Sequence, residues 1–208
     1  MLSLIKANYR TYVNARSKRL EGHTRRVVFF ALCSVAASAL SEPSSADIYA
    51  MMTTGLTILT GFTFTALFSD HSLAEVGLAK PKNETDRQEL GRLTKLAENF
   101  QVRSRYFITL SIVDVCLLII LSLDLTVPGV FKDFSMRTAL LYHVNPRKLL
   151  DLFEVISAIV LYTSTSAAMF LFLECLYSFY RLTETIMAIV NARRSYMKAS
   201  DASGETLL

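Results

Sequence analysis

Residues 85–125 read TDRQELGRLTKLAENFQVRSRYFITLSIVDVCLLIILSLDL, and the character of this stretch changes halfway. Its first half is charged, with apolar residues at the spacing of an amphipathic helix, namely Leu90, Leu93, Ala97 and Phe100. From Tyr106 onward it is apolar apart from Asp114, as in a helix that crosses a bilayer. Because no proline interrupts it, we predict one rod of about 60 Å, half in lipid and half in the cytosol.

The composition of the whole chain agrees with a membrane protein. Of 208 residues, 52% are hydrophobic and only 19% are charged, and the apolar residues form long runs rather than a periodic pattern. The three cysteines all lie inside such runs, so they indicate neither a disulfide framework nor a metal site. We predict an all-α polytopic membrane protein with four transmembrane helices, two of which extend into the cytosol.

The runs and the polar segments between them divide the chain into five parts. These are a basic amphipathic cytosolic segment (1–26), a transmembrane hairpin (27–68, with spans 27–41 and 48–68), a cytosolic helical segment (69–105), a transmembrane pair (106–180, with spans 106–125 and 151–180 joined by an external loop 126–149), and a cytosolic C-terminal extension and tail (181–208).

The N-terminal segment carries seven basic residues against a single acid, Glu21. Two interpretations are open: a helix lying on an anionic leaflet, or a positive flank that holds the N-terminus in the cytosol. The small residues 37–39 resemble a signal-peptide cleavage site. The basic region before them is longer than usual, which favours an uncleaved first span.

The distribution of charge predicts the topology. Lys and Arg number seven in 1–26, none in 41–47, seven in 69–105, four in 126–149 and four in 181–208. The positive-inside rule then places both termini in the cytosol. We expect a multi-pass protein of the bacterial inner (plasma) membrane.

Two acids fall within the predicted spans, Asp114 and Glu174. Counted from the cytosolic ends of their spans, both lie about 9–12 Å deep. Acids at matching depth often face a bundle interior, so we predict an intramembrane polar pair. It could sense protons or cations, or form a polar ring in an oligomeric pore. The structural alternative is an interhelical hydrogen bond, or Glu174 reaching Arg181.

The second span contains small residues at strict four-residue intervals, Thr53, Thr57, Gly61 and Thr65. Such a ridge lets helices approach closely in lipid, so a helix-packing ridge is predicted. The alternative is that the hydroxyls line a water-filled path.

No catalytic constellation is recognisable. Ser164 and Ser166 lie in mid-span, but no histidine lies in any span to serve as their base. We therefore predict no enzymatic activity, no catalytic residues, no metal and no cofactor. The basic loops lack a nucleic-acid-binding module, so no direct nucleic-acid contact is expected.

Both cytosolic extensions are amphipathic, and their apolar stripes need partners. We predict a homo-oligomeric scaffold or sensor in the lipid bilayer, which recruits a soluble cytosolic protein through the helix of Leu90, Leu93, Ala97 and Phe100. The alternative is a small oligomeric ion channel with Thr-rich and acidic pore-lining residues. A transporter is disfavoured by the short chain without internal repeats.

The plan of about 200 residues, four spans, basic cytosolic loops and no catalytic motif resembles the membrane subunits of bacterial anti-phage defence systems, such as KwaA of Kiwa. The resemblance rests on architecture, so it transfers no functional residue. It implies a membrane sensor of phage attack that works with a soluble, nucleic-acid-binding effector.

Overall fold

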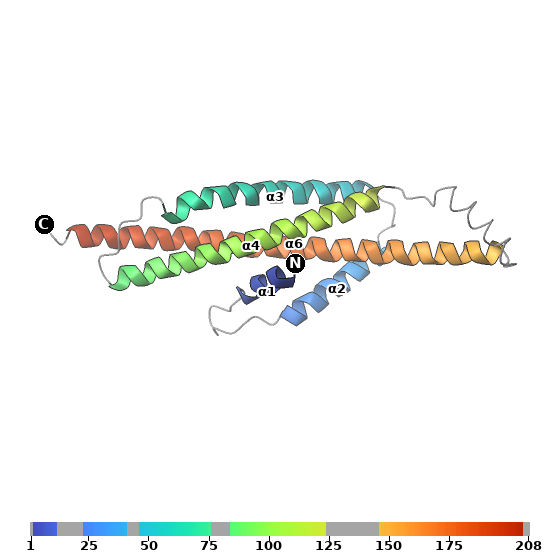
Figure 1. The fold of residues 1–208 in the computed structure, drawn as a ribbon, viewed down its shortest axis with the longest axis horizontal. Coiled ribbons are helices and arrows are strands. Elements are labelled where there is room, and N and C mark those ends of the chain that lie inside the picture. Colours follow the sequence, from blue (N-terminus) through green and yellow to red (C-terminus); the bar gives the residue numbers. More distant parts are fainter. Residues whose placement is uncertain (1, 12–22, 41–45, 76–83, 124–145, 206–208) are drawn as a thin grey trace.

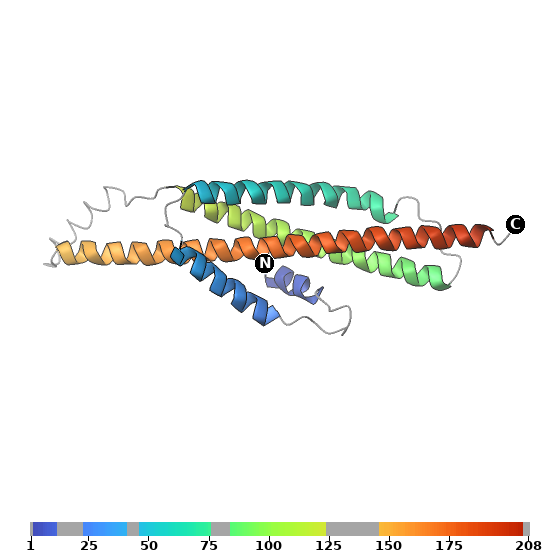
Figure 2. The same ribbon diagram turned by 180° about the vertical axis from the view of Figure 1, so that it is seen from behind.

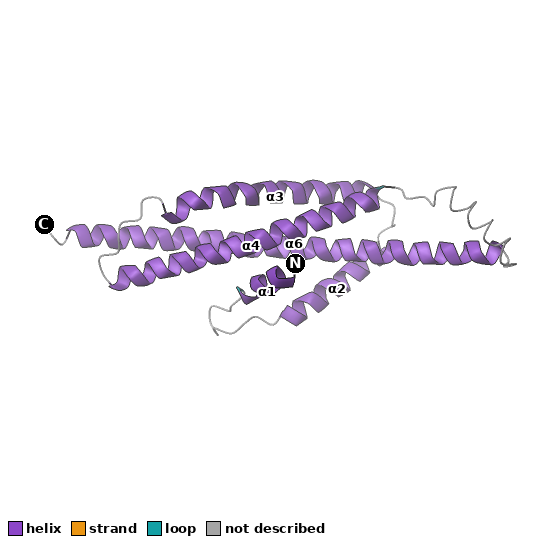
Figure 3. Ribbon diagram, viewed as in Figure 1, coloured by secondary structure: helices purple, strands orange, loops and turns teal. Residues whose placement is uncertain are grey.

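The computed structural model describes residues 2–11, 23–40, 46–75, 84–123 and 146–205. Within these ranges the chain is helical and contains no strand, as Figure 3 shows, so the all-α class is confirmed. The helices are α1 (Leu2–Arg10), α2 (His23–Leu40), α3 (Ala46–Glu75), α4 (Glu84–Ser122) and α6 (Pro146–Glu205).

The predicted rod is one continuous helix. α4 spans 39 residues, from the charged start at Glu84 through the apolar end at Ser122. The change from polar to apolar side chains does not break it, since every backbone group is bonded within the helix in either surrounding.

α6 is longer than predicted, at 60 residues or roughly 90 Å. It begins at Pro146, a residue suited to the first turn of a helix, where a missing N–H costs nothing. It ends at Glu205, so most of the predicted C-terminal extension and tail is a continuation of this helix. The absence of any later proline explains this length.

The helices are arranged around the pair formed by α4 and α6. Figures 1 and 2 show α3 along one edge, α1 and α2 along the opposite edge, and α4 with α6 between them. α4 packs on α3, α6 and α1, while α2 packs on α6. The main core joins Tyr49 and Leu56 of α3 to Phe107 and Leu118 of α4 and Cys175 of α6.

Within the described residues, three helices contain a segment long and apolar enough to cross a membrane, namely Asp47–Leu67 in α3, Leu90–Ser122 in α4 and Val155–Met197 in α6. The predicted first span coincides with α2, but the apolar part of α2, residues 27–40, is shorter than the roughly 20 residues that a span usually needs. The external loop predicted at 126–149 lies outside the described residues, except for 146–149, which begin α6.

A joint where four helices meet

An ion pair connects α2 to α6. Arg26 Nη2 donates to Glu174 Oε1 over 2.9 Å, and the two side chains are 13% and 3% exposed. Arg26 also lies over the ring of Tyr177, with Cζ 4.0 Å from the ring centroid, so the guanidinium is held on two sides. A carboxylate this deeply buried requires such a partner, since an unpaired charge there is costly.

Two further tyrosines bring α1 and α4 to the same carboxylate. Tyr9 and Tyr106 each direct their hydroxyl at Glu174 Oε1, over 3.4 and 3.5 Å. Burial, reinforced by the negative charge of Glu174, raises the pKa of the Tyr9 phenol, which keeps its proton available for donation. We call Tyr9, Arg26, Tyr106, Glu174 and Tyr177 the joint, because together they fasten α1, α2, α4 and α6.

A second cation fastens the end of α1. Arg103 of α4 is 8% exposed and donates to the hydroxyl and the carbonyl of Thr11 over 2.9 and 2.7 Å. It also donates to the carbonyl of Arg181 over 3.2 Å and to the hydroxyl of Thr185, both on α6. Arg103 therefore links three helices close to the joint.

α1 consequently lies on the protein with its apolar face. Leu4 and Ile5 pack against the main core and Asn8 is completely buried, whereas Lys6 and Arg10 are exposed. In the described part of this segment, residues 2–11, Leu4 and Ile5 are covered by the main core and so do not face a leaflet. The rest of the segment, 12–22, lies outside the described residues, so both interpretations of the segment stay predictions.

Among the described residues no hydrogen bond joins Asp114 to Glu174, and Glu174 is paired with Arg26 of α2. The two acids lie on facing stretches of the antiparallel pair, where Ser111 of α4 is 3.7 Å from Cys175 of α6. Asp114 is completely buried, and among the described residues neither of its carboxyl oxygens has a hydrogen-bond partner.

Three of the four residues of the predicted ridge face outward, and the fourth, Thr53, is half-buried. Thr57, Gly61 and Thr65 are exposed, and a Cβ added to Gly61 would meet nothing within 4 Å. The hydroxyls of Thr57 and Thr65 bond to carbonyls one turn back in α3. α3 packs on the bundle through its other face, so no described helix of the same chain packs on the ridge.

The apolar stripe predicted to dock a soluble protein is covered by α6. Leu93 is buried against Ala192 and Tyr196, with Leu90 at the edge of the cluster. Phe100, 2% exposed, packs with Leu182 and Ile189. The helix of Leu90, Leu93, Ala97 and Phe100 is thus not an open docking surface in this structure, because each extension covers the stripe of the other.

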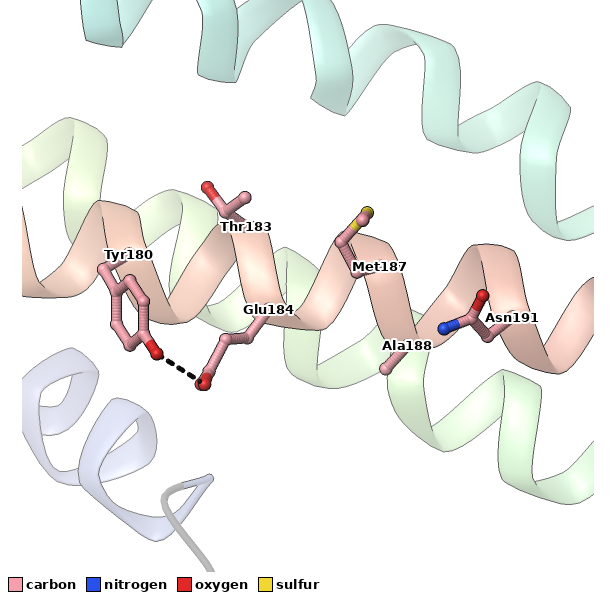
Figure 4. A pocket seen from close by; sticks show the side chains of 6 residues that line it. All are labelled: Tyr180, Thr183, Glu184, Met187, Ala188 and Asn191. Atoms are coloured by element: carbon pink, nitrogen blue, oxygen red, sulfur yellow. Dashed lines mark hydrogen bonds between the residues drawn. The ribbon is translucent and has the colours of Figure 1, made fainter.

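An open groove of about 420 Å³ lies instead on the outer face of α6, just beyond the joint. Figure 4 shows its lining side chains, all from this one helix: Tyr180, Thr183, Glu184, Met187, Ala188 and Asn191. Tyr180 and Met187 are 58% and 62% exposed. Tyr180 donates to Glu184 over 3.0 Å, which fixes the acid at the edge of the groove.

Of the two mid-span serines, Ser166 has a structural partner. Ser166 is 2.6 Å from Ser38 of α2, and the neighbouring Thr165 is 3.2 Å from the hydroxyl of Tyr49 in α3. These contacts fix α2 and α3 to α6 at the end of the bundle away from the joint. In the described ranges no group of three or more His, Cys, Asp or Glu could hold a metal ion.

The sequence reasoning missed most of the joint. Arg26 lies 148 positions before Glu174, and no periodicity relates the two. The available signal was positional: Arg26 is the last cation before an apolar run, and Tyr106, Tyr177 and Tyr180 lie where apolar runs meet charged segments. Belts of Tyr and Arg mark such boundaries in membrane proteins.

Comparisons with protein-family models, with curated proteins and with solved structures find no match to the chain. The fold itself defines a class: in its described part, an α-helical protein with three helices apolar enough to cross a membrane.

Replacing Arg103 by alanine should release α1 while leaving the α4–α6 pair folded. Hydrogen bonds to a charged group contribute about 1.5–3 kcal/mol, so we expect the opening of α1 to increase about tenfold or more. Hydrogen–deuterium exchange of residues 2–10 measures this directly. Arg194→Ala is the control, because it removes an exposed cation of α6 that belongs neither to the joint nor to the contacts of Arg103. Equal exchange in the two variants would show that Arg103 does not hold α1.

Proposed function

We propose that the protein is a non-enzymatic scaffold or sensor of the inner membrane that presents cytosolic helices to a soluble protein. One observation carries this proposal: α4 and α6 pack continuously from their apolar segments to their charged ends, through Phe107 with Phe179, then Phe100 with Leu182, and then Leu93 with Ala192. We propose that a change at one end of this continuously packed pair reaches the other end.

The proposed orientation has four spans, including α2, with both termini in the cytosol. It is supported by the position of the basic and tyrosine side chains: Arg26, Arg103 and Arg181 lie at one level of the bundle, with Tyr106 and Tyr177 beside them. In a membrane this level marks the cytosolic boundary. α2 then begins at the boundary and crosses as a short span, which local thinning of the bilayer accommodates.

The groove on α6 is the surface we propose for the soluble partner. It lies on the cytosolic side of the joint, and it combines the exposed apolar side chains of Tyr180 and Met187 with the fixed acid Glu184. An exposed apolar patch rimmed by polar groups is characteristic of a protein-binding surface.

An ion channel is the second candidate function. The arrangement of residues counts against a pore lined by both the threonines and the acids. The acids Asp114 and Glu174 are buried inside the chain, while Thr57 and Thr65 face outward. One pore cannot be lined by both sets. The ridge remains a surface through which copies could associate, since small residues permit close helix contacts in lipid.

Copurification tests the scaffold. A soluble protein retained by the wild-type chain should be lost from Met187→Lys and retained by Met197→Lys, which changes an exposed methionine outside the groove. Loss from both variants or from neither would contradict binding at the groove. Ion flux in reconstituted vesicles that disappears in Asp114→Asn would favour the channel instead.

Anti-phage defence is the biological setting that we propose from the architecture. In that setting the soluble partner is a nucleic-acid-binding effector, and the membrane protein itself touches no nucleic acid. A phage challenge of cells with and without the chain, in the presence of the captured partner, tests this part. Unchanged plaque counts would contradict the role in anti-phage defence without contradicting the scaffold proposal.

A further inference from the structure

Four exposed cations lie close in sequence to joint residues. Lys6 and Arg10 lie on the outer face of α1, Arg25 precedes Arg26, and Arg105 precedes Tyr106. Each is thus within three positions of a joint residue in its own helix. We call these four side chains the basic rim.

Among the described residues no acid neutralises the rim. In the described part of the chain none of the four side chains forms an ion pair, whereas the nearby Arg26 and Arg181 are paired with Glu174 and Glu184. Glu174 is itself 3% exposed and enclosed by Arg26 and two tyrosines, so it cannot serve the rim. The positive charge of the rim is directed outward.

The rim also borders the apolar surface of the helices. Beyond the joint, α2 exposes Val28, Phe29 and Leu32, which are 52–65% exposed and are covered by acyl chains in a membrane. A cation one turn from such a surface lies at the depth of lipid phosphates. α1 adds Lys6 and Arg10 at this level without inserting, since its apolar face is docked on the protein.

We propose that the basic rim binds the phosphate headgroups of anionic phospholipids in the cytosolic leaflet. Its four cations come from three different helices, α1, α2 and α4, so a bound headgroup would hold α1 on the bundle from outside while Tyr9 and Asn8 hold it from inside. The inference rests on the membrane placement in the proposed function. It adds a lipid partner, and with it a dependence of the α1 position on lipid charge.

The strength of the interaction follows from the number of cations. Each Lys or Arg near an anionic surface strengthens binding about fivefold, and the effect decreases with added salt. Removal of all four charges should therefore weaken the preference for anionic lipid at least tenfold, even if only two cations contact one headgroup.

The test compares lipids retained by the full chain in detergent, by native mass spectrometry, with phosphatidylglycerol against phosphatidylcholine. The wild type should retain phosphatidylglycerol preferentially. A variant with Lys6, Arg10, Arg25 and Arg105 each changed to Gln should lose the preference at least tenfold. The matched control changes one Lys and three Arg that are exposed farther along α4 and α6, namely Arg87, Arg92, Lys95 and Arg194.

An unchanged preference in the rim variant would overturn the proposal, and so would an equal loss in the control variant. Soluble glycerol phosphate at millimolar concentration should not displace the lipid, and displacement would indicate a site for soluble anions instead. Circular dichroism of both variants verifies that they fold. Because no soluble protein is present, failure here leaves the groove proposal untouched, and loss of the groove partner leaves the lipid result untouched.

Discussion

Arg26→Ala should lower the free energy of unfolding by about 3 kcal/mol or more, because it leaves the buried Glu174 carboxylate without its cationic partner. The loss includes the stacking of Arg26 on Tyr177. Unfolding by SDS in mixed micelles measures the effect. Arg105→Ala, which removes an exposed cation without an ion pair in the described residues, should change the same quantity by less than about 0.5 kcal/mol.

The double variant Arg26→Met with Glu174→Leu shows whether the stability lost in Arg26→Ala comes from the broken ion pair or from nonspecific damage to the packing. Apolar residues of similar volume remove both the desolvation penalty and the attraction, so much of the lost stability should return. If the double variant is as unstable as the sum of the two single ones, the two side chains do not interact, and the joint as described is wrong.

Phe100→Ala should cost about 3–5 kcal/mol, as expected for a large buried side chain whose site cannot collapse. Phe100 is 2% exposed between Leu182 and Ile189, and it is at the point where the α4–α6 pair leaves its most apolar part. Hydrogen exchange of residues 182–197 should rise in the same variant, because the cavity loosens the extension of α6.

Phe62→Ala is the matched control, since Phe62 of α3 is 65% exposed on the outer surface. Its loss should cost less than about 1 kcal/mol, because it removes contacts with lipid or detergent rather than with protein. Similar costs in the two variants would contradict the tight packing of α4 on α6.

The helices could be predicted well from the sequence, and their partners could not. The sequence predicts α4 as one helix because no proline interrupts the run. Its N-terminal half is predicted from the apolar spacing of Leu90, Leu93, Ala97 and Phe100. The apolar stripe predicts that another element packs on it, but the sequence does not say which element. The cover is α6, which supplies Ala192 and Tyr196 from about one hundred positions downstream.

The joint shows the same limit for polar groups. Depth along a helix can be counted from the sequence, and Glu174 and Asp114, which were placed at matching depth, are both buried in the structure. The rotation of one helix about its axis relative to its neighbours cannot be obtained from the sequence. This rotation decides whether a buried acid faces another acid or a cation. Here Glu174 faces α1 and α2, where Tyr9 and Arg26 are available, and Asp114 does not share them.

Labelling of one new cysteine tests the central proposal, the cytosolic projection of the α4–α6 pair. Met187, 62% exposed in the α6 groove, is changed to Cys in a chain whose Cys33, Cys116 and Cys175 are replaced by Ala. A membrane-impermeant maleimide should label this cysteine in inside-out vesicles, and in spheroplasts only after permeabilisation. Labelling in intact spheroplasts would place the groove outside the cell and contradict both the topology and the scaffold built on it.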